Sequence, residues 1–208
     1  MQTVLAFILV LSASFCKTDD TDIKLDGVIN NAEWAGAREY DLSSGGRLYV
    51  IIKEKVAYLG IKGNDPGWAH VYLHRNDSVK VLHASAALGA QLYTYKNETW
   101  KLQKKFNWEV RESVYDEILK QKQDAYYKKN GWCANNNNTG DKTTLEFKIN
   151  IDYTGTAEPR FAVLYTADAK SLSFYPAGLT DNTLLKELVS GSNPDDLQFR
   201  PETWEKLK

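Results

Sequence analysis

The sequence predicts a mainly β protein, a two-sheet antiparallel β-sandwich of the jelly-roll or immunoglobulin-like kind. Three observations lead to this prediction. Short segments alternate between apolar and polar residues, as half-buried strands do. Gly, Asn, Asp and Pro separate these segments at short intervals. The 208 residues include 12 Tyr and 6 Trp, whose rings pack well on a pleated surface. One inserted helix and short C-terminal helices complete the expected architecture.

In the N-terminal half, alternation defines the strands. Thr21 to Asp26 is expected to be a first strand, followed by the turn DGVINNAEW and one helical turn over Ala32 to Ala37. A hairpin and four further strands follow: Arg47 to Lys53, Val56 to Lys62, Trp68 to His74, Val79 to Ala84, Leu88 to Tyr95 and Thr99 to Phe106. The side chains expected in the core are Val50, Ile52, Leu59, Ile61, Val71, Leu73, Leu145, Phe147 and Val163.

In the C-terminal half, the pattern changes at Arg111. From Glu112 to Lys129 charges are dense and apolar residues recur at helical spacing, which predicts an amphipathic helix ending at Asn130-Gly131. An Asn-rich loop over Asn135 to Gly140 should follow. The remaining elements are expected to be strands over Thr143 to Ile151, Arg160 to Ala167 and Leu172 to Tyr175, and helical segments over Leu184 to Val189 and Pro201 to Leu207.

The N-terminus has features of an export signal. The apolar run Val4 to Leu11 is too short to span a bilayer, and small residues follow it. Cys16 stands where a bacterial lipoprotein carries its acylated cysteine. We therefore expect residues 1–20 to be a signal peptide and tether, residues 21–208 to be one β-sandwich domain, and the protein to be extracytoplasmic, secreted or lipid-anchored through Cys16. The alternative for the apolar run is a buried N-terminal strand.

Charge and cysteine content narrow the function classes. The formal net charge is -1 and the chain has no basic stripe, which argues against a nucleic-acid partner. Cys133 is the only cysteine besides Cys16, so no disulfide framework can form if Cys16 is processed. The sequence also lacks a nucleophile elbow, a phosphate loop and a metalloprotease helix. The sequence thus offers no catalytic motif of these kinds.

One face of two predicted strands is lined by rings with polar edges. Successive side chains of a strand point to opposite faces, so the rings of WAHVYLH share one face while Ala, Val and Leu share the other. Such rings suit sugars, which stack on aromatic planes and hydrogen-bond at their edges. The predicted ligand-binding residues are Trp68, His70, Tyr72, His74, Gln91, Tyr93, Tyr95 and, in a Gly-Trp loop, Trp132. Two alternatives are that the Glu112–Lys129 helix covers this face as a second core layer, and that Trp132 anchors its own loop.

No cofactor is expected, calcium is possible, and the metal ligands are unknown. His70 and His74 lie ~13 Å apart on a strand, too far to share one metal, although His83 could join either from a neighbouring strand. Asn64-Asp65 and Asp141 offer oxygen ligands to calcium, but the acidic spacing of a dedicated calcium loop is missing.

Two parts of the chain carry a family resemblance. DGVINNAEWAGA with the hairpin RLYVIIKEKVAYLGIKGND, and NGWCANNNNTGDKTTLEFKINI, resemble the family-nine carbohydrate-binding modules and their wider superfamily, which includes the DOMON domains. The resemblance implies a two-sheet sandwich that binds sugars through aromatic rings, in some members with calcium. We therefore expect an exported, non-catalytic domain with a carbohydrate or glycan ligand. The alternatives are a glycan-processing hydrolase, or an accessory domain of one, and an envelope lipoprotein whose partner is another protein.

Overall fold

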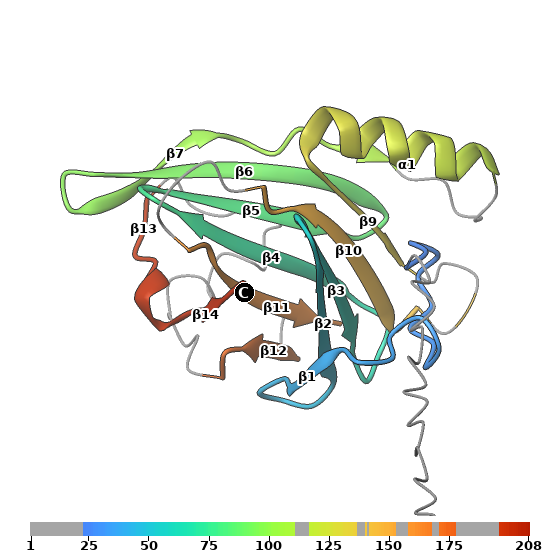
Figure 1. Ribbon diagram of the computed structural model, residues 1–208. Coiled ribbons are helices and arrows are strands. Elements are labelled where there is room, and N and C mark those ends of the chain that lie inside the picture. The colour runs from blue at the N-terminus through green and yellow to red at the C-terminus, as the bar shows by residue number, and fades with distance from the viewer. Residues whose placement is uncertain are drawn as a thin grey trace, which may run out of the picture.

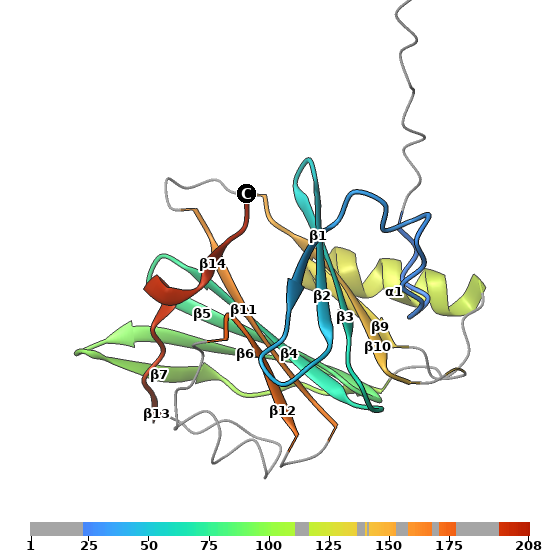
Figure 2. The ribbon, with the colours of Figure 1, turned by 90° about the horizontal axis from the view of Figure 1, so that it is seen from below.

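The strands pair into two antiparallel sheets that form a β-sandwich, as predicted (Figure 1). The computed structural model describes residues 23–110, 117–136, 140, 142–152, 158–167, 171–177 and 196–208. Sheet A has the strand order β1-β2-β3-β10-β9, and sheet B has the order β12-β11-β4-β5-β6-β7-β13, with β14 paired to β11 and β8 paired to β6. Figure 2 shows the two sheets as layers that cross at an angle.

Sheet A contains the predicted hairpin, with both strands at their expected bounds. Its strands are β1 (Arg38–Asp41), β2 (Arg47–Lys53), β3 (Val56–Lys62), β9 (Trp132–Asn136) and β10 (Thr144–Asn150). Two of these differ from expectation. β1 is a short strand that the sequence did not indicate. β9 occupies the start of the predicted Asn-rich loop, where Asn135 pairs with Glu146 and Asn136 with Leu145 of β10.

Sheet B contains six of the predicted strands and three two-residue strands that the sequence did not indicate. Its strands are β4 (Trp68–Arg75), β5 (Ser78–Ala84), β6 (Ala87–Lys96), β7 (Thr99–Lys104), β8 (Glu109–Val110), β11 (Arg160–Thr166), β12 (Leu172–Tyr175), β13 (Asp196–Leu197) and β14 (Glu205–Lys206). Asn76 and Asn97 adopt φ values of 49° and 51° in the two tight turns, a left-handed conformation that Asn tolerates better than most residues.

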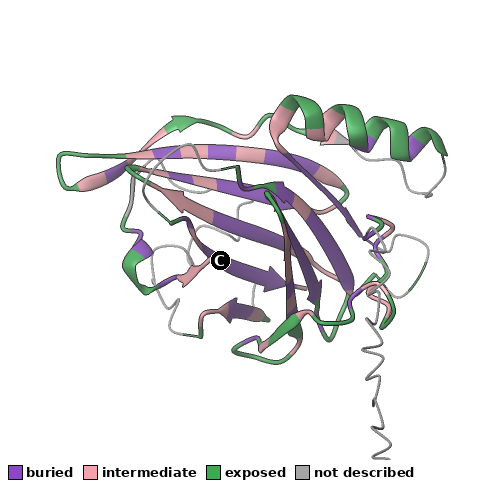
Figure 3. Ribbon diagram, in the orientation of Figure 1, coloured by how far each residue is buried: buried purple, intermediate pink, exposed green. Residues whose placement is uncertain are grey.

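The main core lies between the two sheets, where the central strands are almost entirely buried (Figure 3). The predicted core faces are confirmed. Seven of the nine predicted residues are buried, and Ile52 and Leu73 are partly buried and pack against the same cluster. Along each strand, residues that point into the core alternate with residues that point to the outer face, because successive side chains of a strand point to opposite sides.

The helix α1 (Glu117–Asn130) lies against the edge strand β9 and closes the sandwich on that side (Figure 1). It ends where predicted: Gly131 has a φ of 72° and donates its backbone N–H to Tyr127 at 2.8 Å. Lys80 reaches from sheet B and donates to the carbonyl oxygen of Asn130 at 3.1 Å, a favourable place for a cation. The expected start at Glu112 lies outside the described residues.

Four predictions for the N-terminal and C-terminal parts of the chain have different outcomes. Residues 23–26 are not a strand, because the carbonyl oxygen of Leu25 accepts hydrogen bonds from the side chains of Gln123 and Asn135 instead of a strand partner. The predicted Pro201–Leu207 helix is wrong: only Pro201–Thr203 forms a 3-10 turn, and β14 follows. Cys16 and the predicted Leu184–Val189 helix lie outside the described residues. Within the described residues, no helix is long and apolar enough to cross a membrane.

Candidate functional site

The outer face of sheet B carries the predicted ring-bearing residues, and their shared face is confirmed by the strand register. His70 pairs with His83, Tyr72 with Val81, and Val81 in turn with Gln91. The expected exposure of this face is wrong at its centre. His70, Tyr72, Gln91 and Tyr93 are each at most 2% exposed, and Trp68 is partly buried.

The cover over this face comes from the C-terminal segment and from the connection after β7. Phe199 and Trp204 lie with their ring centroids 6.0 and 5.9 Å from the ring of Tyr72. At the other end, Phe106 and Trp108 stack on each other at 4.4 Å. The helix α1 does not take part, since it lies at the β9 edge. The rings therefore form a second core layer, as in the alternative interpretation of this face. The cover differs from that alternative, because it comes from the C-terminal segment and the connection after β7 and not from the helix.

Gly89 makes room for this cover. A Cβ atom at position 89 would lie 2.8 Å from the ring of Trp108 and 2.9 Å from that of Phe106. Beneath these rings, His70 and His83 meet across the strands with ring centroids 4.8 Å apart. Burial, and secondarily the neighbouring His83, hold the pKa of His70 well below its usual range. His70 is consequently neutral at physiological pH and belongs to the packed layer.

At the far end of sheet B this layer opens into a groove of about 420 Å³, in which two of the predicted binding residues, His74 and Tyr95, lie together. Tyr95 is 46% exposed, and its ring centroid lies 5.1 Å from that of the buried Trp100. The other lining residues are Asn76, Asp77, Arg160, Gln198, Phe199, Pro201 and Glu202.

The groove is built by segments that lie far apart in the sequence. Trp100 donates its indole N–H to the carbonyl oxygen of Phe199 at 3.1 Å, which ties β7 to the C-terminal segment. Arg160 donates to the carbonyl oxygens of Glu202 and Trp204, both at 3.0 Å. The groove thus has a fixed aromatic floor and a rim of exposed polar side chains from Asn76, Asp77, Gln198 and Glu202.

His74 is the titratable ring of the groove. Partial burial is the main cause that lowers its pKa, and Arg160 lowers it further. A hydrogen bond with the backbone of Asn76 and the nearby carboxylates of Asp77 and Glu202 act in the opposite direction. A neutral imidazole offers one donor and one acceptor, which suits recognition of hydroxyl groups.

Comparisons of the chain with protein-family models, curated proteins and solved structures found no match.

Trp132, the remaining predicted binding residue, is 1% exposed. Its ring lies edge-on to Tyr126 of α1 at 5.5 Å and stacks on Phe147 at 6.3 Å. The expectation of an accessible stacking ring is wrong here, because β9 turns Trp132 toward the interior of the sandwich and α1 covers it. The alternative, an anchoring ring, describes its position better.

The candidate ion ligands do not come together as a metal site in the described residues. Asn64 and Asp65 line a polar pocket of about 210 Å³ with serine side chains, and no group of three or more His, Cys, Asp or Glu is found in the described part of the chain. Asp141 lies outside it.

Glu146 is a buried acid that the sequence alone did not single out as unusual. Its two carboxyl oxygens accept hydrogen bonds from the backbone N–H of Gly27 at 2.7 Å and the indole N–H of Trp34 at 3.1 Å. Burial raises its pKa to about 8, with a smaller contribution from Asp26. Because both oxygens are engaged by the N-terminal segment, Glu146 holds that segment on sheet A, and its altered pKa has a structural cause.

Proposed function

We propose that this protein is a non-catalytic binding domain that recognises a carbohydrate in the groove of His74, Tyr95 and Trp100. The observation that supports this most is the half-exposed ring of Tyr95, which packs at a tilt beside the buried ring of Trp100 and shares the groove with polar side chains. A sugar presents C–H faces to such a ring and hydroxyl groups to its surroundings.

The polar rim fits the same ligand class. Asn76 and Gln198 carry amides that both donate and accept, and Asp77 and Glu202 carry carboxylates that accept. Since sugar hydroxyls do both, a rim of mixed donors and acceptors suits them better than a rim of one charge. The proposal agrees with the resemblance to family-nine carbohydrate-binding modules, which stays a prediction.

Tyr95→Ala is expected to weaken polysaccharide binding by roughly 1–3 kcal/mol, the loss of one good ring contact. Its stability should change by about 1 kcal/mol or less, because an exposed ring contributes little to the core. Native affinity gels cast with xylan, hydroxyethyl cellulose or alginate would measure binding, and thermal melts would measure stability.

Trp108→Ala is the matched control. Trp108 is also 46% exposed and packs over the same face of sheet B, but it lies near the opposite end of β6, beside Gly89. It should leave polysaccharide retardation unchanged. Retardation that is lost in Trp108→Ala and kept in Tyr95→Ala would move the site away from the groove. No retardation of the wild-type protein by any of these polysaccharides would count against carbohydrate binding as a whole.

A glycan-processing hydrolase is the second candidate, because Asp77 and Glu202 line the same groove. Glycosidases use two carboxyl groups on either side of the bond to be cleaved. Both side chains are exposed here, however, whereas the general acid of a glycosidase is held in an apolar environment. The release of reducing ends from xylan by the wild-type protein, lost in Glu202→Gln, would favour hydrolysis over binding alone.

We also propose that the protein is exported and carries a lipid on Cys16. The support for this is the apolar run Val4 to Leu11 and the small residues between that run and Cys16. Cys16→Ser should move the protein from the membrane fraction to the soluble fraction. Unchanged fractionation would remove the lipid anchor and leave simple secretion.

A further inference from the structure

The groove of His74, Tyr95 and Trp100 carries two exposed carboxylates, those of Asp77 and Glu202. Among the described residues, neither side chain forms an ion pair or accepts a hydrogen bond. A carboxylate without a partner in the protein keeps the lone pairs of both oxygens for a ligand. The groove therefore offers a ligand two acceptor groups of negative charge.

The cation that lines the groove, Arg160, is directed to the protein backbone. It pairs with His74 across β11 and β4, and its Nη1 donates to the carbonyl oxygens of Glu202 and Trp204, both at 3.0 Å. A guanidinium held in this way has fewer N–H groups left for a ligand. Because the lowered pKa of His74 keeps its ring neutral at pH 7, the lining has one net negative charge.

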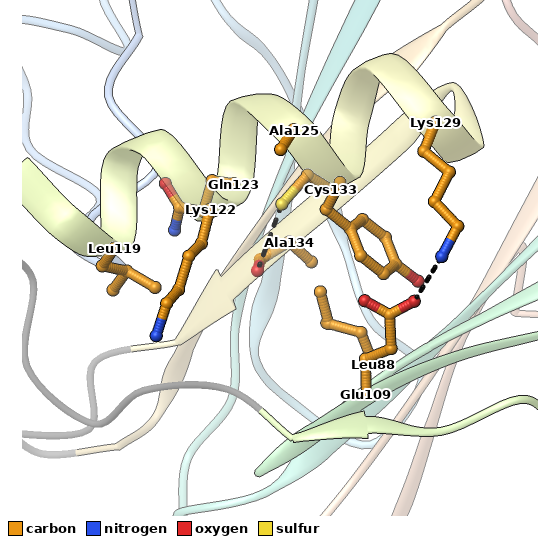
Figure 4. Close-up of a pocket in the computed structure, with 10 residues that line it drawn as sticks. Leu88, Glu109, Leu119, Lys122, Gln123, Ala125, Lys129, Cys133 and Ala134 are labelled. Carbon is orange, nitrogen blue, oxygen red and sulfur yellow. Dashed lines mark hydrogen bonds and ion pairs between the residues drawn. The ribbon is translucent and has the colours of Figure 1, made fainter.

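The pocket between α1, β9 and β6 shows the opposite arrangement (Figure 4). There Lys129 is paired with Glu109 at 3.2 Å, and Lys122 also has an interaction partner. Other parts of its lining, such as Leu119 and Ala134, are apolar. Of these two sites, the groove is therefore the one whose charged side chains are available to a ligand.

The half-exposed ring of Tyr95 favours a cation as well. The face of an aromatic ring carries partial negative charge and attracts a cation that lies over it. Tyr95 and the two carboxylates line one groove of about 420 Å³, so a saccharide that enters the groove meets both. An ammonium group is attracted by the ring and by the carboxylates, whereas the carboxylate of a uronic acid is repelled by both.

We propose that the glycan recognised in the groove is cationic, an amino sugar with protonated amino groups. This inference rests on the proposed carbohydrate binding and names its ligand class. The sugar stacks on Tyr95, and an ammonium group donates charge-assisted hydrogen bonds to Asp77 or Glu202. Neutral sugars use the same ring and the amides of Asn76 and Gln198, and bind more weakly.

Titration calorimetry on the full chain with three tetrasaccharides of different charge is the primary test. The glucosamine tetramer and cellotetraose share one backbone and carry an amino group or a hydroxyl group at the second ring carbon, and the matching glucuronic acid tetramer is anionic. The conditions are about pH 6, where amines are protonated, and ~0.05 M salt, where charges are only partly screened. The glucosamine tetramer should bind about fivefold more tightly than cellotetraose, the effect of one well-formed exposed ion pair. The glucuronic acid tetramer should bind more weakly than cellotetraose.

The outcomes separate this inference from the proposed function. Equal binding of the glucosamine tetramer and cellotetraose, with both weakened by Tyr95→Ala, would overturn the cationic ligand and leave carbohydrate binding in the groove intact. Binding of the glucosamine tetramer that Tyr95→Ala leaves unchanged would place this ligand outside the groove and overturn the inference. Absence of binding by all three tetramers would count against both.

Two carboxamide variants locate the charge. The double variant Asp77→Asn/Glu202→Gln keeps the shape of both side chains and removes their charge, so the preference for the glucosamine tetramer over cellotetraose should fall below about twofold. Glu54→Gln removes the same kind of charge at an exposed turn of sheet A, outside the groove lining, and should keep the preference of about fivefold. A preference that survives in the double variant, or that is lost equally in Glu54→Gln, would contradict recognition by the groove carboxylates.

Discussion

The wild-type protein is expected to lose about 2 kcal/mol of unfolding free energy between pH 6.5 and pH 8.5, and Glu146→Gln is expected to remove most of this loss. Glu146 is fully buried in sheet A, and its pKa is raised to about 8 from an ordinary value of 4.5. The whole difference corresponds to on the order of 4–5 kcal/mol, at about 1.4 kcal/mol per pKa unit.

The sign follows from proton linkage. The folded protein keeps the proton of Glu146 until the pH approaches 8, whereas the unfolded chain releases it from about pH 4.5. This contribution to stability is therefore complete below pH 4.5 and is lost as the pH rises through 8. His70 acts in the opposite direction, since its lowered pKa destabilises the fold only below about pH 6.5. Between pH 6.5 and 8.5 the loss expected from Glu146 is therefore not offset by His70.

The glutamine variant should also be less stable than wild type at pH 6.5, by about 1–3 kcal/mol. A glutamine side chain has one acceptor oxygen, whereas Glu146 serves two donors, Gly27 and Trp34, and a buried donor without a partner is costly. Urea unfolding at half-unit pH steps would measure both effects. Glu54→Gln, at an exposed hairpin turn, is the matched control and should keep the wild-type slope. If the unfolding free energy of Glu146→Gln fell with pH as steeply as that of the wild type, a group other than Glu146 would be responsible for the loss.

Much of the fold could be predicted because a strict alternation of apolar and polar residues defines where each strand begins and ends and which face it buries. The hairpin of β2 and β3 has its predicted bounds, and β4, β5 and β6 begin and end within one residue of expectation. β9 escaped prediction because Asn is depleted in strands in general. Here the amide of Asn135 is satisfied by the carbonyl oxygen of Leu25, 110 residues away, and no local pattern reveals such a partner.

The cover of the ring-bearing face could not be predicted for the same reason. The segment WAHVYLH has the same alternation whether its rings meet solvent or a second layer, and Phe199 and Trp204 arrive from the other end of the chain. One signal was present nonetheless. In β11 the run FAVLY is apolar on both faces, which is typical of a strand buried on both sides.

The groove itself was half predictable. His74 and Tyr95 were predicted because each is the last ring in the alternating pattern of its strand. Both lie near the strand ends, beyond the part of the face that is covered. Arg160, Gln198 and Glu202 gave no signal, since a strand start and a turn near the C-terminus are ordinary places for polar residues. Their role depends on tertiary contacts, such as the hydrogen bonds from Arg160 to the backbone of residues 202 and 204.

Tyr72→Ala is expected to cost ~3–5 kcal/mol of unfolding free energy, the range for removing a large ring from a packed core. Tyr72 is 0% exposed and contacts the rings of His70, Phe199 and Trp204. Its removal would leave a cavity under the C-terminal segment, whose Phe199 and Trp204 rings pack against it. Tyr95→Ala deletes the same side chain from the open end of the same face and is the natural comparison.

Urea unfolding of both variants, together with Tyr72→Phe, separates packing from hydrogen bonding. Tyr72→Phe keeps the ring and loses only the contact of its hydroxyl with His70 at 3.3 Å, so its cost should be ~1 kcal/mol or less. If Tyr72→Ala unfolded within half a kilocalorie of wild type, the C-terminal cover would not be packed on sheet B. The whole ring-bearing face would then be accessible, and the proposed binding surface would extend from Tyr95 of β6 to Trp68 of β4.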